Sequence, residues 1–133
     1  MIIIDTSALV AILTGEPEAE AFERLLAVHT ALGISAATWV EATMVCWSRM
    51  PDGIRRLREL SALLSIEQHP LDAGQADIAT DAFIRFGRGS NSPAKLNLGD
   101  CFSYALAKSL DAPLLFKGDD FVHTDIRPAL DAR

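Results

Sequence analysis

The sequence predicts an α/β domain built on a parallel sheet. Short apolar segments rich in β-branched residues alternate along the chain with longer segments whose apolar residues recur at helical spacing. This alternation is typical of strand–helix–strand units, in which the strands run parallel. The chain has 133 residues, of which 50% are hydrophobic, and this is enough to fill a core without disulfides. We therefore expect a single domain over residues 1–133.

The first part of the chain predicts two strands and two helices. Residues 1–5, "MIIID", are an unbroken apolar run before the acid, as in a strand buried on both faces. Residues 7–15 predict a short helix that ends at a glycine. Residues 17–32 predict a second helix, because a proline opens the segment, acids come early and apolar residues follow at helical spacing. Residues 32–35, "LGIS", predict the second strand.

The middle of the chain predicts a helical pair and a third strand. Residues 38–50 have helical spacing up to a Pro-Asp-Gly turn, and residues 53–64 are helical again. The segment "LSIEQ", residues 64–68, predicts the third strand.

The last part predicts two helices around a polar loop, followed by two strands. The helix over residues 72–87 begins at an aspartate that can cap it, with Gln75 as the capping partner. After the loop "GRGSNSPAK" comes a helix over residues 98–110. Residues 112–117 predict the fourth strand, and a short fifth is expected near Ile126. The expected architecture is a sheet of about five parallel strands flanked by helices.

Composition restricts the possible functions. A net charge of −6, from 12 basic and 18 acidic residues, argues against a protein held on nucleic acid by a large basic face, although not against an enzyme that acts on nucleic acid. No segment approaches the ~20 apolar residues of a membrane span, and the N-terminus lacks a basic leader. We expect a soluble, cytoplasmic protein with no membrane partner. Cys46 and Cys101 lack metal-ligand spacing and are expected to be reduced, buried thiols.

Acidic residues stand at the ends of predicted elements, in apolar surroundings. Asp5 ends the first strand, and Asp119 and Asp120 follow the fourth. If these two strands are neighbours, their acids share the edge of the sheet where ligands bind in α/β folds. Glu41 and Asp100 stand near the amino ends of helices.

Each acid also has a structural interpretation. Asp5 can cap the helix that follows it. Glu41 can form a capping box with Thr38, and Asp100 can sit in a helix first turn capped by Asn97. Taken together, however, several carboxylates in such surroundings would repel one another, and a divalent cation relieves that repulsion. Mg²⁺ and Mn²⁺ prefer carboxylate oxygens, so the acids predict a site for one of these metals.

Four blocks of the sequence resemble the PIN-domain ribonucleases, and most closely the VapC toxins of bacterial toxin–antitoxin pairs. The blocks are "IIIDTSALVAIL", "SAATWVEA", "LNLGDCFSYALAKSL" and "LLFKGDDFVHTDI", in that order between Met1 and about Arg127. The resemblance implies a three-layer PIN fold and a Mg²⁺- or Mn²⁺-dependent endoribonuclease toxin that cleaves RNA. It also implies a VapB-like antitoxin that inhibits the enzyme, a homodimer and a toxin–antitoxin hetero-oligomer.

The resemblance carries over residue by residue to an acidic site. Its catalytic and metal-binding acids are Asp5, Glu41, Asp100 and Asp119. The fourth is ambiguous, because Gly118 stands where many PIN proteins place an acid, and Asp120 is the alternative to Asp119. Ser7 matches a small polar residue that accompanies the first aspartate, and together with Thr6 it is expected to line the site.

The residue types suit metal-assisted hydrolysis of a phosphodiester. A metal ion lowers the pKa of bound water and neutralises charge on the phosphate. We expect Asp5 and Asp100 to be the principal ligands and Glu41 to bind a second ion or orient the water. Asp119 would hold ligands or waters from the outer shell.

Basic residues must offset the negative charge of such a site. Arg85, Arg88 and Lys95 surround the polar loop before Asp100, and we expect them either to contact the RNA backbone or to belong to an ordinary solvated loop.

Apolar residues beyond the needs of a core point to partners. Trp39, Trp47, Met50 and the end of the first helix are expected to pack in the core, but the resemblance also suggests a groove near the first helices for an antitoxin segment. Two other hypotheses remain open. One is a non-toxin PIN-like nuclease or phosphatase, and the other is a catalytically silent interaction module whose acids only cap helices.

Overall fold

A four-stranded parallel sheet with strand order β3-β2-β1-β4 forms the centre of the fold. The structure is a computed structural model that describes residues 1–29 and 31–130. The strands are β1 (Ile2–Ile4), β2 (Leu32–Ser35), β3 (Glu67–His69) and β4 (Leu114–Leu115). Because all pairs are parallel, the carboxyl ends of the strands lie at one edge of the sheet. The pairing of β1 with β4 confirms that Asp5 and the acids after β4 share that edge.

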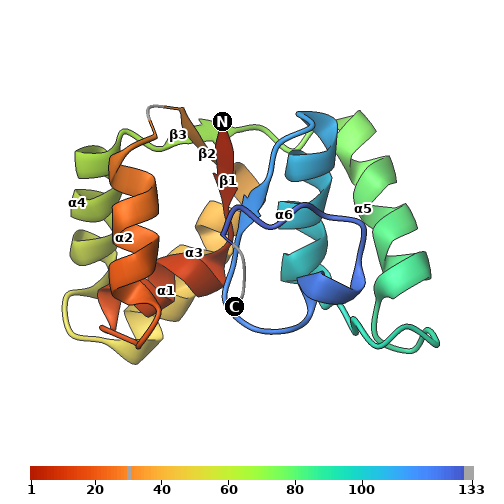
Figure 1. The fold of residues 1–133 in the computed structure, drawn as a ribbon, viewed down its shortest axis with the longest axis horizontal. Coiled ribbons are helices and arrows are strands. Elements are labelled where there is room, and N and C mark those ends of the chain that lie inside the picture. The colour runs from red at the N-terminus through yellow and green to blue at the C-terminus, as the bar shows by residue number, and fades with distance from the viewer. Residues whose placement is uncertain (30, 131–133) are drawn as a thin grey trace.

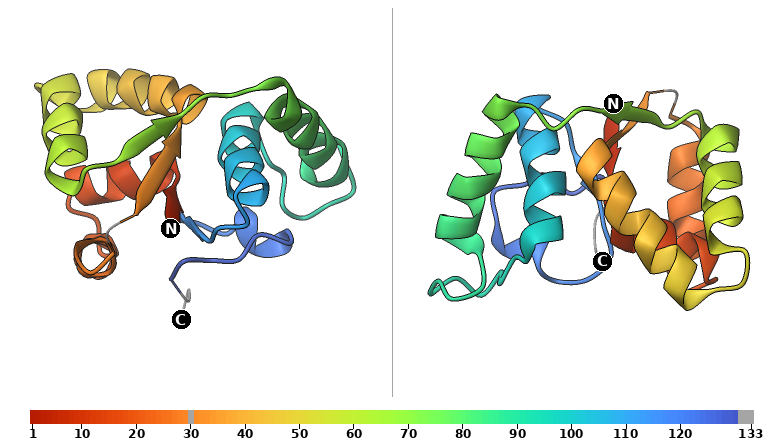
Figure 2. Two further views of the ribbon diagram at one scale, coloured as in Figure 1. Left: turned by 90° about the horizontal axis from the view of Figure 1, so that it is seen from above. Right: turned by 180° about the vertical axis from the view of Figure 1, so that it is seen from behind.

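Helices cover both faces of the sheet. The described residues form α1 (Thr6–Leu13), α2 (Ala19–Ala27), α3 (Ala36–Arg49), α4 (Gly53–Leu64), α5 (Ala73–Phe86) and α6 (Leu98–Ser109). Figure 1 shows α1–α4 on one side of the strands and α5 and α6 on the other, and Figure 2 shows the same separation from above and behind. The three-layer α/β prediction is therefore confirmed. Within residues 1–29 and 31–130, no helix has the length and apolar character needed to cross a membrane.

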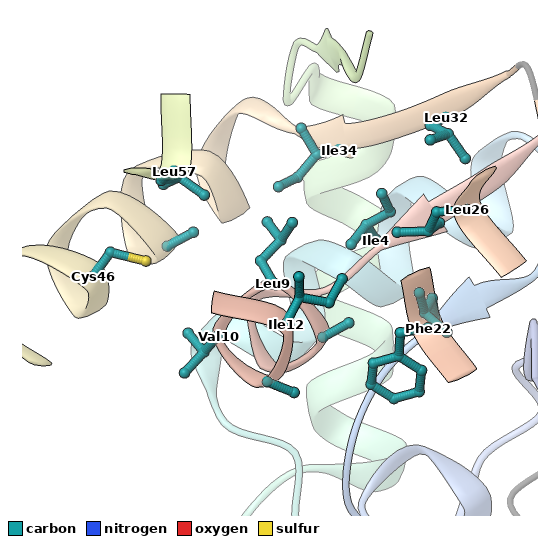
Figure 3. Packing of buried hydrophobic residues seen from close by; sticks show 14 of the residues in the cluster. Ile4, Leu9, Val10, Ile12, Phe22, Leu26, Leu32, Ile34, Cys46 and Leu57 are labelled. Atoms are coloured by element: carbon teal, nitrogen blue, oxygen red, sulfur yellow. The ribbon is translucent and has the colours of Figure 1, made fainter. Parts of the chain in front are cut away.

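Strand β1 is apolar throughout because both of its faces are buried. Ile2 and Ile4 belong to the core cluster under α1–α4, whereas Ile3 belongs to the cluster under α5 and α6. Figure 3 shows the first cluster, with Ile4 among side chains from α1, α2 and β2. Cys46 and Cys101 are buried free thiols, one in each cluster, as expected.

The largest differences from the predicted element boundaries are at α2 and β3. Helix α2 spans Ala19–Ala27 rather than residues 17–32, although residue 30 lies outside the described part of the chain. Strand β3 begins at Glu67 rather than at residue 64, because α4 continues to Leu64 and ends at Ser65, whose φ of 53° breaks the helix. The helix predicted over residues 53–64 is confirmed.

The expected fifth strand is reduced to a single bridge. Near Ile126 the chain runs beside β4, where Leu114 forms an isolated parallel bridge with Pro128. The Leu114 N–H donates to the Arg127 carbonyl at 2.9 Å, and the Ala129 N–H donates to the Leu114 carbonyl at 2.8 Å. A strand cannot extend easily through Pro128, because proline has no N–H to donate to the ladder.

Asp125 ties the C-terminal segment to α6. Its carboxylate accepts a hydrogen bond from the Tyr104 hydroxyl at 2.6 Å and from the Lys108 ammonium at 3.0 Å. Partial burial alone raises the pKa of Asp125, but these hydrogen bonds and the positive charge of Lys108 outweigh burial and leave the pKa below its usual value.

Helix α3 presents an apolar stripe to solvent. Trp47 is 72% exposed, so the prediction that it packs in the core is wrong. Cys46, one position earlier, is buried, and the helical turn therefore carries Trp47 away from the core, on the exposed side with Val40 and Met44. Met50 is buried as expected.

Candidate active site

Asp5 stands at the junction of β1 and α1. It is the N-cap of α1, and its Oδ2 accepts hydrogen bonds from the Ser7 backbone N–H at 3.0 Å and the Ser7 hydroxyl at 2.7 Å. The capping role expected of Asp5 is confirmed. Only 3% of Asp5 is exposed, so its carboxylate needs such partners.

The second oxygen of Asp5 is held from the opposite side of the sheet. Asp5 Oδ1 accepts a hydrogen bond from the Ser103 hydroxyl of α6 at 2.6 Å. The sequence analysis missed Ser103. The available signal was a serine in the apolar run "CFSYALA", three positions after Asp100 and therefore on the same helical face.

Glu41 is not part of a capping box, and that structural alternative is wrong. Helix α3 begins at Ala36, capped by the Ser35 hydroxyl, so Thr38 lies inside the helix and is buried. The Glu41 carboxylate instead accepts a hydrogen bond from the Thr6 hydroxyl at 2.6 Å. Burial raises the pKa of Glu41, and the charge of Asp5 adds to that rise, while the Thr6 hydrogen bond opposes it.

Gly99 allows α6 to approach the Glu41 carboxylate closely. A Cβ atom at position 99 would lie 1.9 Å from Glu41 Oε2, far inside van der Waals contact. Any side chain at position 99 would therefore displace Glu41.

Asp100 forms the capping box expected at the start of α6. The Asp100 N–H donates to Asn97 Oδ1 at 2.9 Å, and the Asn97 N–H donates to Asp100 Oδ2 at 3.0 Å. Burial raises the pKa of Asp100 to about 7, helped by the negative charges of Asp5, Asp120 and Glu41 and opposed by the Asn97 hydrogen bond. These charge effects show that the carboxylates lie within electrostatic reach of one another.

Asp119 and Asp120, the two alternatives for the fourth acid, both follow β4. Both are exposed in the turn after β4, just before a 3₁₀ turn at Phe121–His123. The negative charge of Asp120 is among the causes that raise the pKa of Asp100.

An open cavity of about 410 Å³ contains the three predicted acids Asp5, Glu41 and Asp100. Thr6 and Ser7 also line it, as expected. The sequence analysis missed its two cations, Arg49 and Lys117.

Lys117 is engaged by acids at the rim of this cavity. Its ammonium forms an ion pair with Glu16 and lies 3.5 Å from Glu18 Oε2, while its backbone N–H donates to the Ser7 hydroxyl at 3.0 Å. Arg49, by contrast, forms no ion pair with an acid in the part of the chain that the structure describes.

The donor chemistry of the cavity fits a hard divalent cation. Asp5, Glu41 and Asp100 line it with three carboxylates of like charge, and carboxylate oxygens are the ligands that Mg²⁺ and Mn²⁺ prefer. In the arrangement observed for residues 1–29 and 31–130, no three Asp, Glu, His or Cys side chains are close enough to hold one ion together. For Asp5, Glu41 and Asp100 to bind a single ion, at least one of these side chains must therefore rotate.

Comparisons with known proteins identify the family. The PIN-domain family model matches residues 2–127. Ribonuclease VapC42 of Mycobacterium tuberculosis is 45% identical over 128 residues, covering 96% of this chain and 98% of that protein. The chain belongs to the PIN-domain family, among the VapC ribonucleases.

Solved structures support the PIN fold. The crystal structure of Mycobacterium tuberculosis VapC20, described as a Sarcin-Ricin loop cleaving toxin, matches with a TM-score of 0.73 at 16% identity, covering 95% of this chain and 96% of that one. A toxin–antitoxin complex from Klebsiella pneumoniae matches with a TM-score of 0.68 at 22% identity, covering 91% and 90%. At these identities the likeness concerns the fold.

The basic residues expected to contact RNA do not line the PIN-domain cavity. Arg85 pairs with Asp81 at 3.3 Å, lies 3.9 Å from Asp125 and covers the Phe86 ring at 4.7 Å. Arg88 and Lys95 are exposed in the loop between α5 and α6. The structure therefore brings Asp5, Glu41 and Asp100 together at the cavity, and Asp119, Asp120 and these cations are not among the residues that line it.

Proposed function

We propose that this chain is a metal-dependent endoribonuclease toxin that hydrolyses RNA phosphodiester bonds at the Asp5–Glu41–Asp100 cavity. The observation that carries the proposal is the convergence of these three carboxylates from the β1–α1 junction, α3 and α6 at the carboxyl edge of a parallel sheet. Membership of the VapC ribonucleases supports the substrate class.

We assign the site residues different roles in hydrolysis. Asp5 and Asp100 would hold Mg²⁺ or Mn²⁺, and Glu41 would bind a second ion or orient the attacking water. Asp120, or Asp119 in its place, would hold waters from the exposed turn after β4. When bound, the metal ion supplies Lewis acidity, which makes water a better nucleophile and neutralises charge on the phosphate.

Arg49 is the best-placed contact for the RNA backbone. It lines the cavity of the carboxylates and forms no ion pair among the described residues, interacting with Glu16 only through longer-range charge, so its guanidinium is available to a phosphate. Lys117 lines the same cavity but is partly neutralised by Glu16 and Glu18. We therefore assign backbone contact to Arg49 first, in preference to Arg85, which is already paired.

A VapB-like antitoxin is the proposed inhibitor, and a homodimer within a toxin–antitoxin hetero-oligomer is the proposed assembly. The Klebsiella pneumoniae toxin–antitoxin complex, which has a similar fold, supports such a partner. An arginine of the antitoxin in the acidic cavity would pair with carboxylates that otherwise repel one another.

The test is RNA cleavage by the purified chain with and without Mn²⁺ or Mg²⁺. We expect cleavage only with metal, and loss of cleavage in the Asp5→Asn and Asp100→Asn variants. Asp77→Asn, on the exposed surface of α5, is the matched control and should cleave like the wild type. Circular dichroism would verify that each variant is folded.

The same experiment separates the competing functions. Cleavage of single-stranded DNA but not RNA would favour another PIN-like nuclease. Complete inactivity with no stabilisation by metal would favour an interaction module, for which the helix-capping roles of Asp5 and Asp100 already provide a structural purpose. Wild-type cleavage by folded Asp5→Asn would rule out the proposed metal site.

A further inference from the structure

Two buried hydroxyls form a chain that ends on Asp5. Thr38 in α3 and Ser103 in α6 are both 0% exposed, and their hydroxyl oxygens lie 3.2 Å apart. The Ser103 hydroxyl also lies 2.6 Å from Asp5 Oδ1. Three elements that are far apart in the sequence, β1 with its cap, α3 and α6, are thus linked through two side chains.

The direction of this chain follows from counting hydrogens. A serine hydroxyl has one hydrogen, and Ser103 donates it to the carboxylate of Asp5, which can only accept. Thr38 must therefore donate to Ser103 rather than accept from it. The order is Thr38 to Ser103 to Asp5, so Thr38 can act on Asp5 only through Ser103.

The bond from Ser103 to Asp5 differs from those of three threonine hydroxyls in or at the ends of helices. Thr14, Thr43 and Thr80 each donate to the carbonyl oxygen four residues earlier, at 2.7, 2.8 and 2.9 Å, which satisfies the hydroxyl within its own segment. The carbonyl oxygen four residues before Ser103 belongs to Gly99, but the Ser103 hydroxyl donates to the Asp5 carboxylate instead.

The hydrogen bonds also determine which oxygen of Asp5 remains available. An ionised carboxylate has about four acceptor positions, two on each oxygen. On Oδ2 both are occupied, by the Ser7 N–H and the Ser7 hydroxyl, and on Oδ1 one is occupied, by Ser103. The free acceptor position therefore lies on Oδ1, the oxygen that Ser103 holds.

We propose that Thr38 and Ser103 are positioning residues that orient Asp5 Oδ1 as a metal ligand. The inference rests on the proposed function, because it assumes that Asp5 binds the metal. Without Ser103, Oδ1 loses the hydrogen bond that opposes rotation of the carboxylate, and the oxygen is no longer aligned before the ion arrives.

Mn²⁺ binding to the purified chain, measured by titration calorimetry, tests this proposal without relying on activity. We expect Ser103→Ala to weaken Mn²⁺ binding by ~10–100-fold, as is usual when the partner of a ligand is removed. Thr38→Val, which keeps the shape but removes the hydroxyl, should weaken it less. Thr38→Ser, which keeps the hydroxyl, should restore it.

A double variant provides the sharpest readout. Because Thr38 acts through Ser103, the Ser103→Ala/Thr38→Val protein should bind Mn²⁺ as Ser103→Ala does, with no additional loss. Thr43→Val is the matched control, because it removes a hydroxyl from the same helix that bonds only the Trp39 carbonyl. It should bind Mn²⁺ like the wild type.

Failure of this inference and failure of the proposed function give different results. If Asp5→Asn abolishes Mn²⁺ binding but folded Ser103→Ala binds like the wild type, the positioning role is wrong and the metal site stands. Losses that add in the double variant would also overturn the positioning role. If the wild type itself does not bind Mn²⁺, the proposed function fails, and the inference fails with it. Should Ser103→Ala not fold, the Thr38→Val and Thr38→Ser pair decides the question.

Discussion

Replacing Gly99 with alanine should separate the stability of the fold from the activity of the site. The new Cβ would lie 1.9 Å from Glu41 Oε2, so the Glu41 carboxylate must move away. That movement breaks the 2.6 Å hydrogen bond from the Thr6 hydroxyl. The helix itself tolerates the change, because the clash is with the end of a flexible side chain.

Two energetic effects of the substitution act in opposite directions, and the destabilising one is larger. Alanine in place of glycine stabilises a helix by up to ~1 kcal/mol. A lost hydrogen bond to a charged group costs roughly 1.5–3 kcal/mol. The free energy of unfolding should therefore fall by about 0.5–2 kcal/mol, which corresponds to roughly 2–8 °C in Tm. Cleavage should fall by ~100-fold, because a catalytic group displaced by about 1 Å loses that much.

Gly74→Ala is the matched control, because Gly74 and Gly99 are both the second residue of a capped helix. A Cβ at position 74 would meet nothing closer than Asp72 Oδ1 at 3.5 Å, an ordinary contact. Gly74→Ala should thus be as stable as the wild type or more stable, with unchanged cleavage. Thermal denaturation and metal-dependent RNA cleavage, measured on both variants, complete the test. If Gly99→Ala behaved like Gly74→Ala in both assays, the placement of Glu41 would have no catalytic importance.

Three further predictions concern charge, pH and packing. Arg49→Ala should raise KM for RNA, and the slope of log KM against log salt concentration should fall by about one counterion. Arg88→Ala should change neither quantity. Equal effects of the two substitutions across a salt series would contradict the assignment of RNA backbone contact to Arg49. The Asp125 carboxylate has a lowered pKa in the folded chain, so its stabilisation is present above the usual aspartate pKa of 3.8 and is lost as the pH falls through the folded value. Asp125→Asn should accordingly destabilise the chain at pH 7 but lose its effect in acid, as measured by denaturant unfolding. Trp47→Ser should change the free energy of unfolding by less than ~0.5 kcal/mol, against ~2–5 kcal/mol for Leu57→Ala in the core; a large loss at Trp47 would show that the exposed stripe of α3 is covered.

The fold was predictable because its signals are local. The apolar run before Asp5 reflects a strand buried on both faces. Asn97 and Asp100, three positions apart, form the capping box that begins α6. Boundaries were less predictable where two local signals competed. Ser35 and Thr38 are both good N-caps, and the structure uses Ser35 because Thr38 is buried against Ser103.

The candidate site was predictable in its acids but not in its cations. Acids at strand and helix ends are recognisable, because the topology of a parallel sheet carries them to one edge. Arg49 lies at the end of α3, eight residues after Glu41, and Lys117 follows β4; no motif in the sequence distinguishes either from the exposed arginines elsewhere. Their position on the cavity depends on how α3 crosses the sheet and on the path of the chain after β4.

The sequence by itself determined the layered α/β fold, the family and the identity of the acids, because periodicity, caps and ordered motifs are properties of neighbouring residues. Only the tertiary structure decided what each acid contacts. Thr6 and Glu41 are 35 residues apart, and Ser103 and Asp5 are 98 apart, yet each pair is joined by a 2.6 Å hydrogen bond. Such contacts depend on the packing of α3 and α6 around the end of β1. A buried carboxylate is destabilising unless it accepts hydrogen bonds, and the hydroxyls that this packing brings close supply them.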